Sequence, residues 1–430
     1  MKTRIFLALL LSLALLQGCS KSSGGSSSPV NGSVRLVNAA LAYPSLDMSV
    51  PGGTLATAVA TGSASAYIPI APGTYSVSLS ATGSGNPLSQ QSVLAYTGVA
   101  YALVAHTEGG QLKLTALSED QAAPAAGYGS IRLSNLALTD TGGVDVYMAA
   151  SGGTATSVPA GVSAMVSNLG MASSYFPIPQ GTYQVWVTGV GNKADVRLYL
   201  PSVVIANQQV LTLALTATTG GVLVDGWLLA QGGTVSALTN TSARIRVAAN
   251  IDPALATGTV VATANGVPLD ASTLVSPAVD TYALVPAGAL SMSVVVEGTA
   301  VNVPNLTAAA GADYTLLAAG TGAKPQFFWL ADDNTLPLGG MAKLRLVNGV
   351  NGLASGISLN SDANLVAQNV AFGTASTPAT LAITGNPSSL QVTGVSSVLP
   401  YTLTLQSQGV YSVFMLGSTG TATQIVRADR

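Results

Sequence analysis

The chain contains one histidine, His106, and a Ser–His–Asp triad would need it as the general base. His106 follows an apolar segment at 101–105 and precedes the letters T-E-G-G, which are typical of a hairpin turn. The corresponding segments of the other repeats described below carry no histidine. We therefore expect His106 to lie at the surface of a turn and to have no catalytic role.

The sequence contains few residues that could bind a metal ion or a cofactor. A zinc site built from histidine and cysteine needs about four ligands, and the chain has one His and one Cys. Adjacent carboxylates occur as Glu119-Asp120 and as Asp332-Asp333. Such pairs could serve glycoside hydrolysis or calcium binding, but both stand where a repeat ends, which favours solvated junction residues. The sequence thus predicts neither an enzyme nor a cofactor.

Four arginines occupy equivalent places in four similar segments. The segments read G-S-V-R-L-V-N, G-S-I-R-L-S-N, R-I-R-V-A-A-N and A-K-L-R-L-V-N, and their central arginines are Arg35, Arg132, Arg246 and Arg345. The flanking apolar residues are expected to face the core, so strand alternation turns each guanidinium to the other face. Two roles stay open there: an ion pair within the repeat, with an acid such as Asp120 or Asp333, or contact with an acidic glycan or a lipopolysaccharide phosphate.

The lone cysteine, Cys19, follows a short apolar segment. Lys2 and Arg4 precede a predominantly apolar run at 5–16, which is short for a membrane span and typical of a signal peptide. The letters L-Q-G-C that end at Cys19 resemble the bacterial lipobox. This resemblance implies cleavage before Cys19 and its acylation, and two or more acyl chains would anchor the chain stably to a membrane.

The residues after Cys19 predict where the chain is held. Ser20 stands where an aspartate would imply retention at the inner membrane, so the lipobox resemblance implies the outer membrane of a Gram-negative bacterium. The Ser- and Gly-rich letters that follow are typical of a flexible tether. We therefore predict a signal peptide at 1–18, a lipidated tether at 19–31, and a lipid-anchored protein on the periplasmic or the surface side of the outer membrane.

The segments that contain the four arginines recur along the chain. The four arginines are 97, 114 and 99 residues apart. Partway into each copy a turn precedes an alternating strand, as in I-A-P-G-T-Y-S-V-S-L from Ile70, and a further strand, as in G-V-A-Y-A-L-V-A-H from Gly98, helps to close the copy. These repeats predict four domains, at 32–120, 129–235, 242–334 and 341–430.

Each repeat contains about seven short strand signals and no convincing amphipathic helix, which predicts an immunoglobulin-like β-sandwich. In the first copy Tyr75, Val77 and Leu79 alternate with serines, a period of two that marks a half-buried strand. A tyrosine after a glycine corner recurs at positions 101, 314 and 411, and indicates either a tyrosine corner or an ordinary buried tyrosine. The predicted fold is all-β: a tandem array of four sandwiches after a lipoprotein signal peptide.

Taken together, the repeated markers resemble the bacterial domain-of-unknown-function 4397 family. The arginine strand, the P-x-G-x-Y turn and the G-x-x-Y-T closing hairpin carry the resemblance, and a D-V-Y strand is present at Asp145-Val146-Tyr147. The resemblance covers nearly all of residues 32–430. It implies a surface-anchored array of β-sandwiches and no reaction.

The amino-acid composition excludes one further class of function. Charged residues make up 7 % of the chain and the net charge is −2, which excludes a basic nucleic-acid binder. We expect a non-catalytic envelope protein that serves structure, adhesion or glycan contact, with the membrane and an envelope glycan or protein as partners. One alternative is an assembly module that pairs through edge strands. Another is an enzyme or inhibitor that uses the long insert at 149–171. Separately, alternation places Trp186 on the face of Gln184 and Thr188, where an exposed tryptophan would suit sugar stacking, although core packing is the more frequent role of such a residue.

Overall fold

The computed structural model describes residues 31–152, 157–252, 258–270, 272–396 and 398–430, and these residues are mostly β-strand. The predicted signal peptide, Cys19 and the tether up to residue 30 lie outside the described residues. The described part has one helix, α1 (Leu138–Thr141), a single turn between two strands. No helix among the described residues is long and apolar enough to cross a membrane. The all-β prediction is confirmed.

The first repeat, for which we keep the predicted range 32–120 as a name, forms eight strands where the sequence indicated about seven. These strands are β1 (Gly32–Asn38), β2 (Ser45–Val50), β3 (Gly53–Ala60), β4 (Ile68–Ile70), β5 (Gly73–Ala81), β6 (Pro87–Ala95), β7 (Ala100–Glu108) and β8 (Gln111–Ser118). One sheet has the order β4-β1-β7-β8 and the other β3-β2-β5-β6. β1 runs parallel to β7. The two-layer architecture is immunoglobulin-like, with four strands in both sheets.

The second repeat follows the same plan. Its elements are β9 (Tyr128–Asn135), α1, β10 (Val144–Ala150), β11 (Ala164–Leu169), β12 (Phe176–Pro179), β13 (Gly181–Gly189), β14 (Asn192–Ile205), β15 (Val210–Ala217), β16 (Val224–Ala230) and β17 (Val235–Leu238). The sheets have the orders β12-β9-β15-β16-β17 and β11-β10-β13-β14. β9 is parallel to β15, as β1 is to β7.

The third and fourth repeats divide some of these strands into shorter pieces. The third has β18 (Ser242–Asp252), β19 (Thr259–Ala264), β20 (Val267–Pro268), β21 (Leu274–Val275), β22 (Ala278–Val279), β23 (Ala283–Pro286), β24 (Gly288–Leu290), β25 (Met292–Val296), β26 (Thr299–Val301), β27 (Leu306–Ala308), β28 (Asp313–Thr321) and β29 (Lys324–Asp332). The fourth has β30 (Met341–Asn348), β31 (Ile357–Ser361), β32 (Asn364–Val370), β33 (Thr374–Ala375), β34 (Ala379–Ala382), β35 (Ser388–Thr393), β36 (Tyr401–Leu403), β37 (Val410–Leu416) and β38 (Thr423–Ala428). β18 is parallel to β28, and β30 to β37.

Local sequence patterns explain these elements. In β5, Val77 and Leu79 are buried in the core of the first repeat while the serines between them are only partly buried, as a period of two requires. The hydroxyls of Tyr314 and Tyr411 accept hydrogen bonds from the amides of Ala309 and Gln406, 3.2 and 3.0 Å away. Both tyrosines therefore close a corner onto backbone five residues upstream, which favours the tyrosine-corner interpretation.

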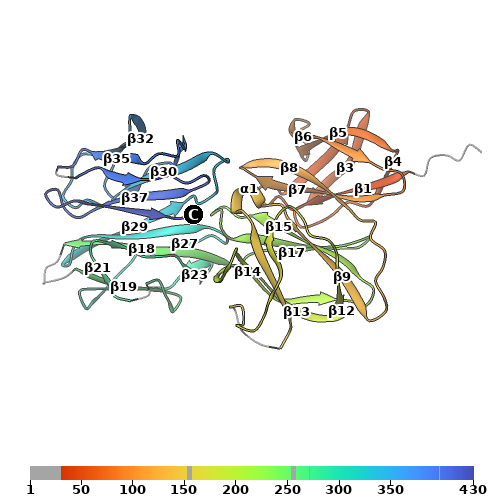
Figure 1. Cartoon of the computed structure of the whole chain (residues 1–430), viewed down its shortest axis with the longest axis horizontal. Helices are drawn as coiled ribbons and strands as arrows, with labels where there is room; N and C mark the ends of the chain where they lie inside the picture. Colours follow the sequence, from red (N-terminus) through yellow and green to blue (C-terminus); the bar gives the residue numbers. More distant parts are fainter. Residues whose placement is uncertain (1–30, 153–156, 253–257, 271, 397) are drawn as a thin grey trace, which may run out of the picture.

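A second layer of apolar packing joins the repeats in pairs (Figure 1). The sheet that contains β1 and β7 lies against the sheet that contains β15 and β16, with Val37, Val104 and Trp227 in their shared cluster. The sheet that contains β18 and β28 lies in the same way against β30 and β37, around Leu317 and Phe414. One outer face of each sandwich is thus a buried interface.

The two pairs meet near the middle of the molecule, where Figure 1 places the C-terminal end. The carbonyl oxygen of Gly311 accepts hydrogen bonds from the Gly220 amide at 2.9 Å and from the Thr218 hydroxyl at 2.7 Å. A Cβ on Gly220 would stand 2.7 Å from that oxygen, so this approach requires glycine. The side-chain carboxylate of Asp140, in α1, accepts a hydrogen bond from the Gly109 amide. The backbone carbonyl of Asp140 accepts one from the Leu336 amide. Arg430 of the fourth repeat donates to the carbonyl of Gly221 at 2.7 Å, so the junction involves all four repeats.

Candidate functional site: a buried arginine network between paired repeats

The four repeated arginines lie at one register position of the fold. They stand on β1, β9, β18 and β30, and the residues opposite them on the parallel neighbour strands are Ala102, Thr212, Thr315 and Ser412. All four side chains point away from the core of their own repeat, as the sequence predicted. That outward face is covered by the paired repeat, so the exposed fractions of Arg35, Arg132, Arg246 and Arg345 are 2, 9, 1 and 4 %.

Arg35 connects the first repeat to the second. Its Nε donates to Glu119 Oε2 at 2.9 Å, and its Nη2 also bonds that carboxylate. The same guanidinium donates to the backbone carbonyls of Gly233, at 2.5 Å, and Ala230, at 2.9 Å. The Tyr67 ring lies 5.0 Å from its centre. Arg35 therefore makes an ion pair within its repeat and hydrogen bonds across the interface.

Arg246 and Arg345 share one buried carboxylate between the third and fourth repeats. Asp332 Oδ1 lies 2.6 Å from Arg345 Nη2, a charge contact without aligned hydrogen-bond geometry, and Asp332 Oδ2 lies 3.4 Å from Arg246 Nη2. Arg246 also bonds Asp429 of the fourth repeat. Burial alone would raise the pKa of Asp332, but Arg345 and Arg246 outweigh burial and hold that pKa below its ordinary value. The carboxylate therefore stays ionised.

Arg132 differs from the other three because no carboxylate lies within ion-pair distance of it in the described part of the chain. Its Nη2 donates to the Thr212 hydroxyl and to the carbonyl of Ser118 in the first repeat, both at 3.1 Å. Its guanidinium lies 4.8 Å from the centre of the Tyr175 ring. Arg132 thus crosses the same interface through neutral partners.

The acids that pair with these arginines are neighbours of those the sequence indicated. Glu119 and Asp332 make the buried contacts, whereas Asp120 is exposed. The Asp333 side chain is 49 % exposed and pairs with Lys343 at 3.0 Å. Strand alternation explains this division, because adjacent residues point to opposite faces. Each acid pair therefore has a member in the interface and a member directed elsewhere.

The asparagine near the end of each arginine strand has a structural role that the sequence pattern did not predict. In the first repeat Asn38 donates to the carbonyls of Tyr43 and Val59 and accepts from the Ala40 amide, which fixes the end of β1. In the third repeat Asn250 instead donates to Gly349 and Gly417 of the fourth repeat. The spacing from the arginine is three residues in the first repeat and four in the third, so alternation directs Asn250 to the interface. That spacing was a readable signal.

His106 is a buried strand residue, so its predicted surface position is wrong. β7 continues to Glu108, and His106 lies on the same face as Ala102 and Val104, which the second repeat covers. Its exposed fraction is 1 %, and Nε2 lies 2.9 Å from the Thr115 hydroxyl. Burial, only partly opposed by Glu108, lowers the pKa of His106 to about 4. The imidazole is therefore neutral at pH 7.

This neutral histidine predicts a pH dependence of stability. The unfolded chain protonates His106 near pH 6.5 and the folded chain near pH 4, so its contribution to stability is complete above pH 6.5 and is lost as the pH falls toward 4. In His106→Gln we expect the unfolding free energy to fall by about 2–3 kcal/mol less than in the wild type between pH 7.5 and 4.5. Denaturant titrations at both pH values measure this, and parallel losses would contradict it.

The tryptophans are structural in three different ways. Trp186 is fully buried and stacks on Tyr199 at 5.6 Å, so the predicted outward face is not open for sugar stacking. Val158 and Val162 of the long insert cover this face. Trp227 lies in the interface between the first and second repeats, and Trp329 stacks on Tyr314. The insert at 149–171, of which 153–156 is outside the described residues, thus packs on its own repeat.

No group of three or more His, Cys, Asp or Glu side chains that could hold a metal ion occurs among the residues the structure describes. The predicted lipidation site, Cys19, lies outside those residues. The arginine network is a recurrent polar feature of the described chain, and its contacts cross the interfaces between paired repeats.

Comparisons with known proteins find a matching family. The family model described as "Domain of unknown function (DUF4397)" matches residues 32–147 and 254–355, which together make up just over half of the chain. No curated protein matches. Among solved structures, "The Bacillus anthracis TIE protein" is 10 % identical over 69 % of this chain, with a TM-score of 0.16. This chain spans about half of that protein chain, 51 % of its length.

Proposed function

We propose that this chain, which belongs to the DUF4397 family, is a non-catalytic outer-membrane lipoprotein that displays paired β-sandwich repeats. Its role would be envelope structure, adhesion or glycan contact. The observation that carries this proposal is the arginine network, because the recurrent charged residues of the repeats bind neighbouring repeats to one another. Interfaces that combine an apolar cluster with buried ion pairs hold the sandwiches in fixed relative positions, as a structural or display protein requires.

The lipobox-like sequence supplies the second half of the proposal. A tether of twelve residues after Cys19, at 20–31, would span up to about 40 Å if fully extended. It would hold the paired repeats close to the membrane surface. Acylation of the Cys19 thiol and of the new amino terminus would insert apolar chains into one leaflet.

The test is the variant Cys19→Ser expressed in a Gram-negative host. We expect the wild type to fractionate with the outer membrane and to carry the added mass of acyl chains, and the variant to lose both. Ser20→Ala serves as the matched control and should leave both unchanged, because the lipid is attached to Cys19. A wild type without lipid mass, or a Cys19→Ser variant with unchanged membrane fractionation, would contradict the anchoring.

Assembly through edge strands is the second candidate, and β6 favours it. This nine-residue strand forms the edge of its sheet and has no charged residue. Leu88 and Leu94 on β6 are 45 and 47 % exposed. An edge strand without charged residues can pair with a strand of another chain, because its outer backbone N–H and C=O groups have no partner in the sheet. Sedimentation of the chain from Ser20 onward over a range of concentrations measures whether such association occurs.

A further inference from the structure

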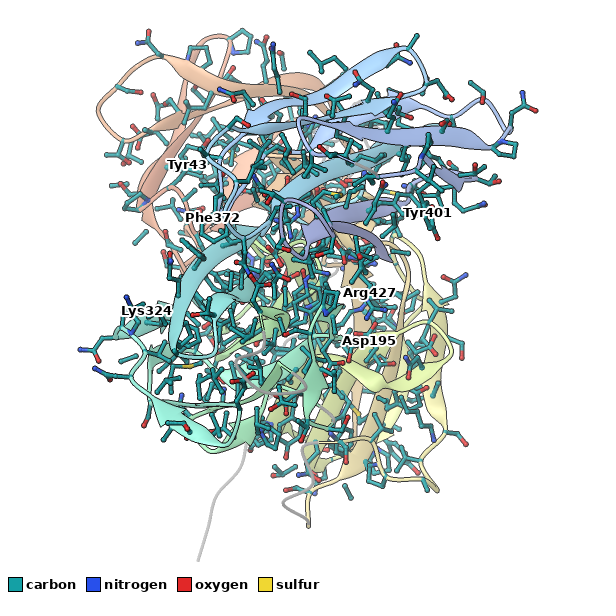
Figure 2. All side chains as sticks on the ribbon, turned by 90° about the vertical axis from the view of Figure 1, so that its left-hand side faces the viewer. Tyr43, Asp195, Lys324, Phe372, Tyr401 and Arg427 are labelled. Carbon is teal, nitrogen blue, oxygen red and sulfur yellow. The ribbon has the colours of Figure 1, made fainter. Side chains whose placement is uncertain are left out.

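A cavity of about 750 Å³ opens where the second, third and fourth repeats meet. This chain has fifteen lysines and arginines in all, and five of its arginines line this one cavity. They are Arg197, Arg244, Arg246, Arg427 and Arg430. Figure 2 labels Asp195 and Arg427, which lie close together between the ribbons of the second and fourth repeats. One third of the lysines and arginines of this weakly charged chain therefore line a single cavity.

The guanidiniums of Arg197 and Arg430 share one hydrogen-bond acceptor. Arg197 Nη1 donates to the carbonyl oxygen of Thr141 at 2.9 Å, and Arg430 Nη2 donates to the same oxygen. Arg430 Nη1 donates to the carbonyl of Gly221 at 2.7 Å. One neutral acceptor thus serves two like charges, which repel each other at short range.

Three of the carboxylates around the cavity pair with other arginines. Asp195 pairs with Arg197 at 3.0 Å, and Asp313 pairs with Arg244 at 2.6 Å. Asp429 pairs with Arg246, and Asp280, which also lines the cavity, accepts the Thr281 amide.

By contrast, the two arginines of the last strand region bond to backbone. Arg427 donates to the carbonyl of Val279, and Arg430 donates to the two carbonyls named above. Within the described residues no carboxylate lies within ion-pair distance of Arg430.

The electrostatics of Arg430 agree with this geometry. Burial and the neighbouring Arg197 and Arg244 together lower the pKa of Arg430 to about 9, and the opposing effects of Asp195 and Asp313 are smaller. A guanidinium normally stays protonated in any protein environment. Its site therefore has an excess of positive potential that a bound anion would neutralise.

We propose that this cavity binds an oxyanion, a phosphate or a carboxylate, through Arg430 and Arg427 with Arg197 beside them. Planar guanidiniums bind both anions bidentately, and the volume is that of a small-molecule site, so the anion would belong to a group such as a sugar phosphate or an acidic sugar. This inference rests on the cavity alone and holds whether or not the chain is anchored to a membrane.

The experiment titrates the chain from Ser20 onward, which contains every described residue, with inorganic pyrophosphate and with glucuronate at low ionic strength. Isothermal titration calorimetry and the thermal unfolding midpoint both report binding. We expect saturable binding of at least one probe, weakened at least tenfold in Arg430→Gln. The matched control is Lys324→Gln, which removes one charge from an exposed hairpin away from the cavity (Figure 2), and its affinity should stay within twofold.

The two probes separate the sources of the anion. Binding of pyrophosphate alone assigns a phosphate group, and binding of glucuronate alone assigns a carboxylate. Arg427→Gln provides the second variant if Arg430→Gln does not fold, with the same expected loss. The proposal is overturned if neither probe binds the wild type saturably, or if the cavity variants bind as tightly as Lys324→Gln.

Discussion

Replacing Asp332 with alanine is expected to lower the free energy of unfolding by about 3–5 kcal/mol. Its carboxylate lies between Arg345 and Arg246, and it also accepts hydrogen bonds from Thr315, at 2.6 Å, and Tyr282, at 2.5 Å. The substitution would leave Arg345 buried without an acid within reach in the described chain. An uncompensated buried charge costs far more than the loss of an exposed pair, because water cannot solvate it.

The neighbouring residue provides the control. Asp333→Ala removes the same carboxylate one position further along the chain, from a pair with Lys343 in which the Asp333 side chain is 49 % exposed. Exposed pairs contribute about 0–1 kcal/mol, so the loss should be small. Denaturant-induced unfolding of the wild type and both variants gives the comparison. Equal losses in the two variants would show that the buried bridge contributes no more than the exposed pair.

Replacing Trp227 with alanine is expected to cost about 3–5 kcal/mol and to separate the first repeat from the second. The indole is fully buried against Val37 and Val104 of the first repeat, and its Nε1 donates to the Thr216 hydroxyl at 2.8 Å. Truncation leaves a cavity in the interface and removes the largest apolar surface that joins the two sheets. Amide hydrogen exchange should therefore become faster in β1 and β7, which belong to the other repeat.

Trp329→Ala is the matched control for this second prediction. Trp329 also stands on the last long strand of its repeat, but it stacks on Tyr314 within the third repeat, with ring centres 4.5 Å apart. Its truncation should lower stability without changing exchange in β1 and β7. Unchanged exchange in these strands in Trp227→Ala would contradict the role that we assign to the interface.

Much of this architecture was readable from local patterns. The alternating strands, the turn glycines and the repeated arginine segments predicted an all-β chain of sandwich repeats, and the DUF4397 resemblance is confirmed. Alternation also predicted correctly that Arg35 and its equivalents point away from their own cores. The anchoring through Cys19, the four domain ranges and the lack of an enzymatic activity stay predictions.

The positions of some asparagines and aspartates could also have been interpreted from the sequence. The spacing from arginine to asparagine is one residue longer in the third repeat, and this shift alone directs Asn250 toward the fourth repeat. Asp145 of the D-V-Y strand accepts the amides of Asn168 and Gly191, at 2.8 and 2.9 Å, and so connects neighbouring strands. Asp47 accepts the Ala58 amide in the same way in the first repeat. These residues recur because the backbone at those places needs an acceptor.

By itself the sequence determined which way each strand side chain points, because a period of two is a property of the local backbone. Only the tertiary structure decided what covers the face that points outward. Arg35 meets Gly233, 198 residues away, and His106 and Trp186 are buried by a neighbouring repeat and by a loop. Hydrophobic burial is non-directional, so an outward face with some apolar residues can be exposed or covered. The packing of distant repeats decides whether such a face is exposed or covered. It buries the arginines, which local patterns placed at the surface, in contacts between repeats.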